Sequence, residues 1–188
     1  MTEVLHVPVE RLGMTLAPLR GQRTDREGTL TALPLRVWPT GNGSYEVLDG
    51  FKRLAAWTGD GRRQVPVVVE HVWGVAAKAR LLTANSPAKT AGPMDEARVA
   101  ASLADDDGLS ILAIAKALGK RKLWVERRLT LARRLAPELG FRLDAGGLSL
   151  STALGLCPFG KTQQMSLAQA IRRHALTTRQ AEAFLTTY

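Results

Sequence analysis

The spacing of apolar residues gives the two halves of the chain different characters. Four apolar or β-branched runs in the first half predict strands, at Leu5–Val9, Leu35–Trp38, Tyr45–Leu48 and Val65–Val69. Residues 39–44 between the second and third runs read Pro-Thr-Gly-Asn-Gly-Ser, which predicts a hairpin turn. Two helices are predicted among these strands, at Phe51–Trp57 and Val75–Ala84. The first half is therefore expected to be an α+β domain.

A break in this pattern falls at residues 85–93, which contain two prolines and a glycine. Such residues end regular structure, so we expect a first domain over 1–92 and a second over 93–188. The second half shows apolar residues at helical spacing and no convincing strand, which predicts an all-α domain. Its predicted helices are Met94–Ala104, Ile111–Leu118, Leu123–Leu135, Leu150–Leu156, Gln163–His174 and Thr178–Thr186.

Composition narrows the classes of function. The 188 residues carry 26 Lys and Arg against 17 Asp and Glu, a formal net charge of +9, which favours a polyanionic partner. The single Cys157 excludes a disulfide framework and cysteine-based zinc sites, and it is expected to be a buried small apolar residue. No apolar run approaches the roughly 18 residues of a membrane span, so no membrane association is expected.

The strongest local pattern is a candidate helix-turn-helix at 109–129. Ser110 can cap a first helix, and Gly119 supplies the turn. The first helix is expected to bury its apolar residues Ile111, Ile114, Ala115 and Leu118 in the domain core. The second is expected to be anchored there by Leu123, Val125 and Leu129. The stretch from Lys116 to Arg134 holds eight basic residues and one acid, a local charge of +7. These features together favour DNA binding.

The second helix is expected to present its basic residues, including Arg128, on its outer side or N-terminal end, with Trp124 contacting either DNA or the domain core. The candidate DNA-binding residues are Ser110, Lys120, Arg121, Lys122, Trp124, Arg127 and Arg128. The alternative is a helical hairpin with a solvated basic face.

A second anion site is indicated where a predicted strand meets a predicted helix, at Asp49-Gly50-Phe51-Lys52-Arg53. Glycine admits a bulky anion close to the backbone, the amides at a helix start point at it, and two cations neutralise its charge. The alternative is a capped helix with two exposed cations.

The order of these motifs resembles the ParB family of chromosome and plasmid partition proteins. Residues 49–56 are similar to the family's Gly-Glu-Arg-Arg box. Asn85, with Pro93 and Glu96-Ala97, looks like its second phosphate motif, and residues 147–153 and 176–182 fit its later helices. The resemblance implies a ParB/sulfiredoxin-like α+β domain followed by an all-α helix-turn-helix domain, in a cytoplasmic protein associated with a nucleoid or plasmid.

The resemblance also implies ligands: CTP with Mg²⁺ in the first domain, and double-stranded DNA in the second. Nucleotide and DNA together would close a homodimeric clamp. Carried over by position, the nucleotide-binding residues are Arg20, Gly50, Phe51, Lys52, Arg53, Asn85 and Lys89, with Asn85 beside the metal. No catalytic residue is assigned.

Departures from the family pattern argue against efficient hydrolysis. Phe51 stands where the family has glutamate, and Ala84 and Ala88 replace charged residues beside Asn85. The chain also ends where family members continue into a dimerisation domain, so we expect either a short relative or a piece of a longer protein.

Two other classes remain open. One is a phosphoryl-transfer enzyme of this fold, similar to serine kinases, for which the nearby Glu46 and Asp49 have no evident partners. The other is a nucleotide-independent repressor of a mobile element.

Overall fold

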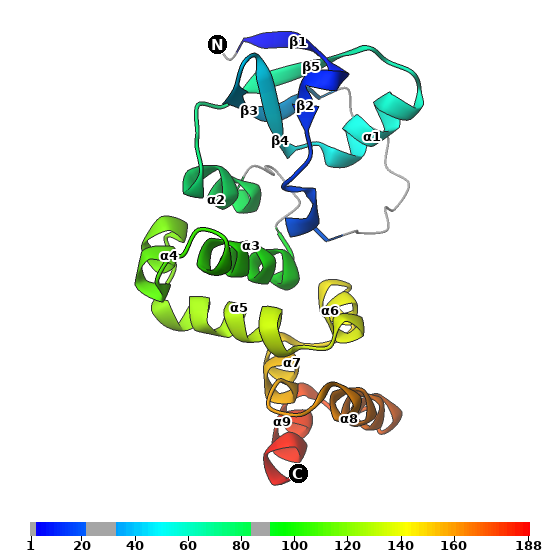
Figure 1. Cartoon of the computed structure of the whole chain (residues 1–188). Coiled ribbons are helices and arrows are strands. Elements are labelled where there is room, and N and C mark those ends of the chain that lie inside the picture. Colours follow the sequence, from blue (N-terminus) through cyan, green and yellow to red (C-terminus); the bar gives the residue numbers. More distant parts are fainter. Residues whose placement is uncertain (1–2, 22–32, 84–90) are drawn as a thin grey trace. The chain divides into compact units, whose positions relative to one another are not determined.

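The computed structural model describes residues 3–21, 33–83 and 91–188. Close contacts divide the chain into two units, Met1–Ala91 and Gly92–Tyr188, and in Figure 1 all of the labelled strands belong to the first. The described residues form the expected α+β part followed by a helical part. None of the helices in the described residues has the length and apolar character that a bilayer-spanning segment needs.

The first unit contains one mixed five-stranded sheet, in the order β1-β5-β3-β4-β2. Its strands are β1 (Val4–Pro8), β2 (Leu12–Gly13), β3 (Leu35–Gly41), β4 (Ser44–Asp49) and β5 (Gln64–Val69). The β3–β4 and β1–β5 pairs are antiparallel, whereas β3–β5 and β2–β4 are parallel. Asn42 and Gly43 have positive φ values of 50° and 72° in the β3–β4 connection, as a tight hairpin turn requires.

One face of the sheet packs against helix α1 (Phe51–Gly59), whose Leu54 and Trp57 join Val37 and Val47 in the core. Since successive strand residues point to opposite faces, Glu46 and Arg36 face the other side. There Arg36 pairs with Glu70 at 2.6 Å, and Glu70 also pairs with Arg80 of helix α2 (Val75–Thr83). These ion pairs tie α2 to the sheet.

The second unit contains seven helices in its described part. They are α3 (Pro93–Asp105), α4 (Ile111–Leu118), α5 (Lys122–Arg134), α6 (Pro137–Asp144), α7 (Leu150–Leu156), α8 (Lys161–Arg173) and α9 (Thr178–Thr187). Helix α3 packs against α4, α5 and α6. Burial raises the pKa of Cys157 to about 11 despite the opposing charge of Arg134, and the side chain is 3% exposed, as expected of a small core residue.

Among the strands and α-helices of the described residues, β2 and α6 escaped the sequence analysis, as did two 3-10 helices at Val9–Arg11 and Ala17–Leu19. Strand β2 has only two residues, too few for an alternation to be visible. Helix α6 begins at Pro137, a residue favoured at the first position of helices, and includes Gly140, so its sequence resembles a loop. A Cβ at Gly140 would lie 3.4 Å from the Met94 side chain, an ordinary van der Waals distance, so Gly140 faces α3 without a requirement for glycine.

A buried glutamine joins three segments of the helical unit. Gln164 is fully buried, and its Nε2 donates to the carbonyl oxygens of Arg134 and Phe159, each at 2.9 Å. Its Oε1 accepts from the amide of Ala136, also at 2.9 Å. These bonds satisfy backbone groups at the α5–α6 junction and before α8, which would otherwise be buried without partners.

Replacing Gln164 with leucine should therefore destabilise the protein by about 3 kcal/mol, because buried backbone groups lose their partners. The matched control is Gln163→Leu, since Gln163 is the exposed neighbour on the same helix. Denaturant unfolding followed by circular dichroism measures both variants. Equal stability of the two would contradict the role given to Gln164.

Candidate DNA-binding and nucleotide-binding sites

The helix-turn-helix begins with a capped helix. The Ser110 hydroxyl accepts the amide of Ala113 at 3.2 Å, which caps α4. Gly119 ends the helix with φ of 62°, a left-handed conformation that favours glycine. Ile114 and Ala115 are buried as expected, while Ile111 and Leu118 are half-buried. The structure thus gives Ser110 a capping role.

The second helix, α5, starts one residue earlier than expected, at Lys122, with Arg121 at its N-cap. Val125 and Leu129 are buried and anchor it. The expectation that Leu123 also anchors it is wrong, because Leu123 is 55% exposed. Leucine was expected to be a core residue on apolar character alone, but this position lies on the helix face opposite Val125 and Leu129.

The expectation that Arg128 lies on the outer side of α5 is also wrong. Its side chain is 8% exposed and contacts Glu96 of α3 through Nη2 at 2.6 Å and Nε at 2.7 Å. A charge removed from water in this way requires a partner, and Glu96 supplies it. Arg128 therefore belongs to the contact between α5 and α3.

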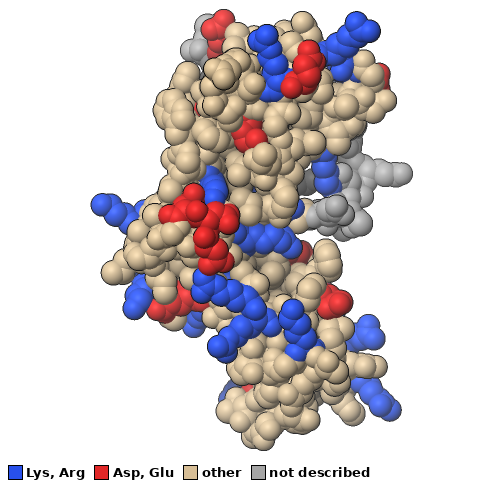
Figure 2. Space-filling view, viewed as in Figure 1, with Lys and Arg blue, Asp and Glu red and all other residues tan. Residues whose placement is uncertain are grey.

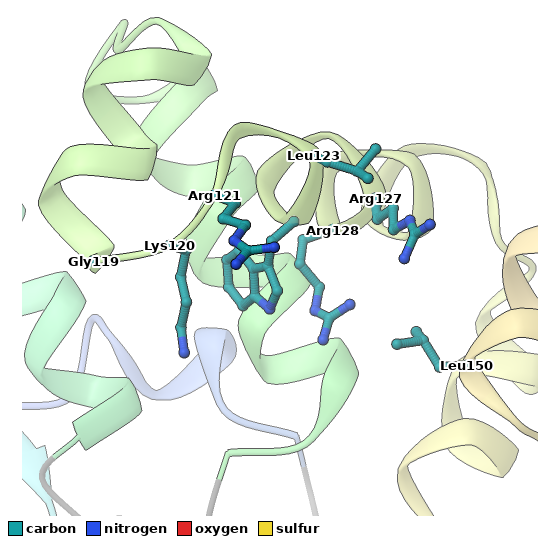
Figure 3. A pocket seen from close by; sticks show the side chains of 8 residues that line it. Gly119, Lys120, Arg121, Leu123, Arg127, Arg128 and Leu150 are labelled. Atoms are coloured by element: carbon teal, nitrogen blue, oxygen red, sulfur yellow. The ribbon is translucent and has the colours of Figure 1, made fainter.

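Trp124 lies between two cations. The Arg128 guanidinium is 4.8 Å from its ring centroid, and the Lys120 ammonium is 5.5 Å from it. The indole is half-buried, so it packs within the unit and keeps an accessible part. Figure 3 shows Lys120, Arg121 and Arg128 in this region, at the turn before α5 and on its first half.

The same region is hollowed. An open pocket of about 380 Å³ is lined by Gly119, Lys120, Arg121, Leu123, Trp124, Arg127, Arg128 and Leu150. Leu150 comes from α7 and faces the α5 side chains across the pocket in Figure 3. The lining combines cations with exposed apolar surface.

The cations of this region divide into two groups. Lys122 pairs with Glu126 at 3.4 Å and Arg133 with Asp105 at 2.6 Å, both on the surface, while Arg128 pairs with Glu96. Lys120, Arg121 and Arg127 are exposed and have no carboxylate at ion-pair distance among residues 3–21, 33–83 and 91–188. Figure 2 shows Lys and Arg side chains gathered over the part of this unit that holds α5.

The candidate nucleotide turn lies where β4 meets α1. Gly50 has φ of 102°, and a Cβ there would lie 2.5 Å from Leu35 Cδ2, so both conformation and packing demand glycine. Phe51 is half-buried against the sheet core, and Lys52 is exposed. The first amides of α1 lie directly after this glycine.

Arg53 is engaged within the protein. Its Nη1 donates to the carbonyl oxygens of Leu33 and Pro34, and its Nη2 pairs with Asp49 at 2.8 Å. The side chain is only 13% exposed. Arg53 and Asp49 thus fix the turn to the start of β3.

Both carboxylates that sequence reasoning left without partners have them. Asp49 binds Arg53, and Glu46 is buried and accepts the amide of Leu16 at 3.1 Å.

Arg20 donates to the carbonyl oxygen of Leu81 at 2.9 Å, which ties the segment after β2 to α2. Asn85 and Lys89 lie outside the described residues. The described parts of the chain contain no group of three His, Cys, Asp or Glu side chains that could hold a metal ion.

A family model described as the ParB HTH domain matches residues 89–188. Among curated relatives, the probable chromosome-partitioning protein ParB of Vibrio cholerae is 28% identical over 83% of this chain and 52% of its own length. The probable chromosome 1-partitioning protein ParB of Deinococcus radiodurans is 30% identical, over 80% of this chain and 51% of its own.

This chain therefore spans about half the length of the curated relatives it matches. One similar solved structure is the crystal structure of C-terminally truncated ParB from Caulobacter crescentus, complexed to the centromeric parS site. It aligns with 98% of this chain over 100% of its own length. It has a TM-score of 0.55 at 24% identity, which shows a shared fold. Because the family model covers more than half of the residues, the chain belongs to the ParB helix-turn-helix family.

Proposed function

We propose that this protein binds double-stranded DNA sequence-specifically through α4 and α5. The observation that carries the proposal is a group of exposed cations, Lys120, Arg121 and Arg127, which have no acidic partner among the described residues. They lie just before and within the N-terminal half of α5, the second helix of the helix-turn-helix. In such motifs this end of the second helix enters the major groove. The buried Arg128–Glu96 pair supports the proposal, since it holds α5 against α3.

Individual roles follow from exposure. Arg121 and Arg127 are proposed to contact base edges or phosphates, and Lys120 and Lys122 to contact phosphates. Ser110 caps α4, so any contact it makes with DNA is secondary to its capping bond. Trp124 and Arg128 are proposed to support the surface rather than to read it.

The double variant Arg121→Ala with Lys122→Ala should bind a selected duplex about 10- to 100-fold more weakly near 0.1 M salt, with a salt dependence reduced by about two counterions. Fluorescence anisotropy over a salt series measures both quantities. The duplexes should come from random-sequence selection, with parS as one probe.

The matched control is Arg172→Ala with Arg173→Ala, which removes two exposed cations from the end of α8. It should change affinity far less. Equal losses in the two double variants would indicate attraction by total charge and would contradict recognition by α5.

We also propose that the turn at Gly50 binds CTP. The resemblance of residues 49–56 to the family's phosphate box and the left-handed Gly50 before the first amides of α1 support this. The exposed Lys52 and these amides are the proposed phosphate contacts, because Arg53 already bonds to Asp49 and two carbonyl groups. Arg20 is proposed to position the segment beside the turn through α2.

Hydrolysis of CTP is expected to be weak or absent. Phe51 brings no carboxylate to the turn, and Asp49 and Glu46 are occupied by protein partners. A Mg²⁺ site is not supported by the described residues. Coupling of CTP and DNA to closure of a homodimer is proposed from the family resemblance alone, and light scattering with both ligands tests it.

Lys52→Ala should weaken CTP binding at least tenfold and lower stability less than Arg53→Ala does, because this exposed side chain is proposed to meet phosphate charge. Arg53→Ala should lower both CTP affinity and stability, the latter by about 2 kcal/mol, since it leaves Asp49 and two carbonyl groups without their partner. Calorimetric titration with CTP, ATP and GTP, together with thermal unfolding, separates the two effects. No preference for CTP at millimolar concentration would overturn nucleotide specificity.

A further inference from the structure

The exposed leucine on the recognition helix is the feature that the charge pattern does not explain. Leu123 lies in the first turn of α5 and is 55% exposed, although neighbouring apolar residues Val125 and Leu129 are buried. A leucine on a water-facing stripe of cations gains nothing from solvent. Exposure of Leu123 would therefore become favourable if a ligand brought an apolar group into contact with it.

The helix geometry defines which way Leu123 faces. Residues at spacings of four, three and four share one side of an α-helix. On α5 this places Leu123, Arg127, Thr130 and Arg134 on one stripe, and Val125 and Leu129 fall on the opposite, buried side. The side of the second helix that points away from the core is the side that enters the major groove.

Leu123 and Arg127 also line the same open pocket, and Figure 3 draws both on the outward part of α5. Arg127 offers hydrogen-bond donors to a base edge or a phosphate. A leucine offers neither donor nor acceptor. In the major groove the apolar feature of the four base pairs is the 5-methyl group of thymine.

We propose that Leu123 is a specificity-determining residue that contacts the 5-methyl group of a thymine, a proposal that rests on the DNA-binding function above. Contact with the methyl group removes apolar surface on both partners from water. Burial of one methyl group corresponds to roughly a fourfold change in affinity. Leu123 precedes Arg127 by one turn of the α-helix, so the thymine it selects would lie close to the base edge or phosphate that Arg127 contacts.

Deoxyuridine tests this directly, since it pairs like thymine but lacks the methyl group. Each thymine of a selected duplex is replaced singly, and binding of the full chain is measured by anisotropy. The unsubstituted protein should lose about fourfold affinity at one thymine of each site. In Leu123→Ala the loss at that position should disappear, while the effect of replacements elsewhere stays unchanged.

Leu112→Ala is the matched control, because Leu112 is a 68% exposed leucine on α4. It should keep the loss at the same thymine, and thermal unfolding should show both variants folded. A full deoxyuridine effect in Leu123→Ala, or none in the unsubstituted protein, would overturn the proposal. If selection yields no preferred duplex, the proposed sequence-specific binding fails first, and this inference fails with it.

Discussion

The geometry of the proposed DNA-binding surface depends on a mostly buried ion pair between Arg128 of α5 and Glu96 of α3. The arginine approaches Glu96 with two nitrogens at 2.6 and 2.7 Å, and its side chain is 8% exposed. Removing either partner would leave a charge with little water, which is costly in a way that loss of a surface pair is not. The pair therefore fixes how α5 lies on α3, and with it the direction of every side chain on the outer stripe.

This contact continues to the turn before α5. The Arg128 guanidinium packs on one side of Trp124, and Lys120 lies over the same indole ring. A cation held over an aromatic ring loses part of its conformational freedom before any ligand arrives. Glu96, Arg128 and Trp124 thus position Lys120 at the N-terminal end of α5, although Glu96 itself lies on another helix.

Much of this organisation could be predicted from sequence, because it depends on local signals. Glycine at 119, a capping serine at 110 and apolar residues at helical spacing specify a helix-turn-helix without knowledge of the rest of the chain. The hairpin turn at residues 42–43 is equally local. The division of cations between packing and exposure could not be predicted, because Glu96 lies 32 residues from Arg128 and nothing in the spacing shows that they meet.

The two expectations that failed on α5 share one cause. Apolar character suggested that Leu123 is buried, and positive charge suggested that Arg128 is exposed, yet the helix phase set by Val125 and Leu129 reverses both. In helix α5 the periodicity was therefore a better guide to orientation than residue type.

The same distinction between charge and availability applies at the turn in the first unit. Arg53 belongs to the basic pair of the phosphate box, but three of its possible hydrogen bonds already go to Asp49, Leu33 and Pro34. Binding phosphate through this guanidinium would require exchange of those bonds, each worth about 1 to 3 kcal/mol when a charged group takes part. Such an exchange gives little net free energy, so the proposed phosphate contacts are the backbone amides at the start of α1, with the exposed Lys52 adding positive charge beside them. Arg53 then acts through the shape of the turn, as Arg128 acts through the placement of α5.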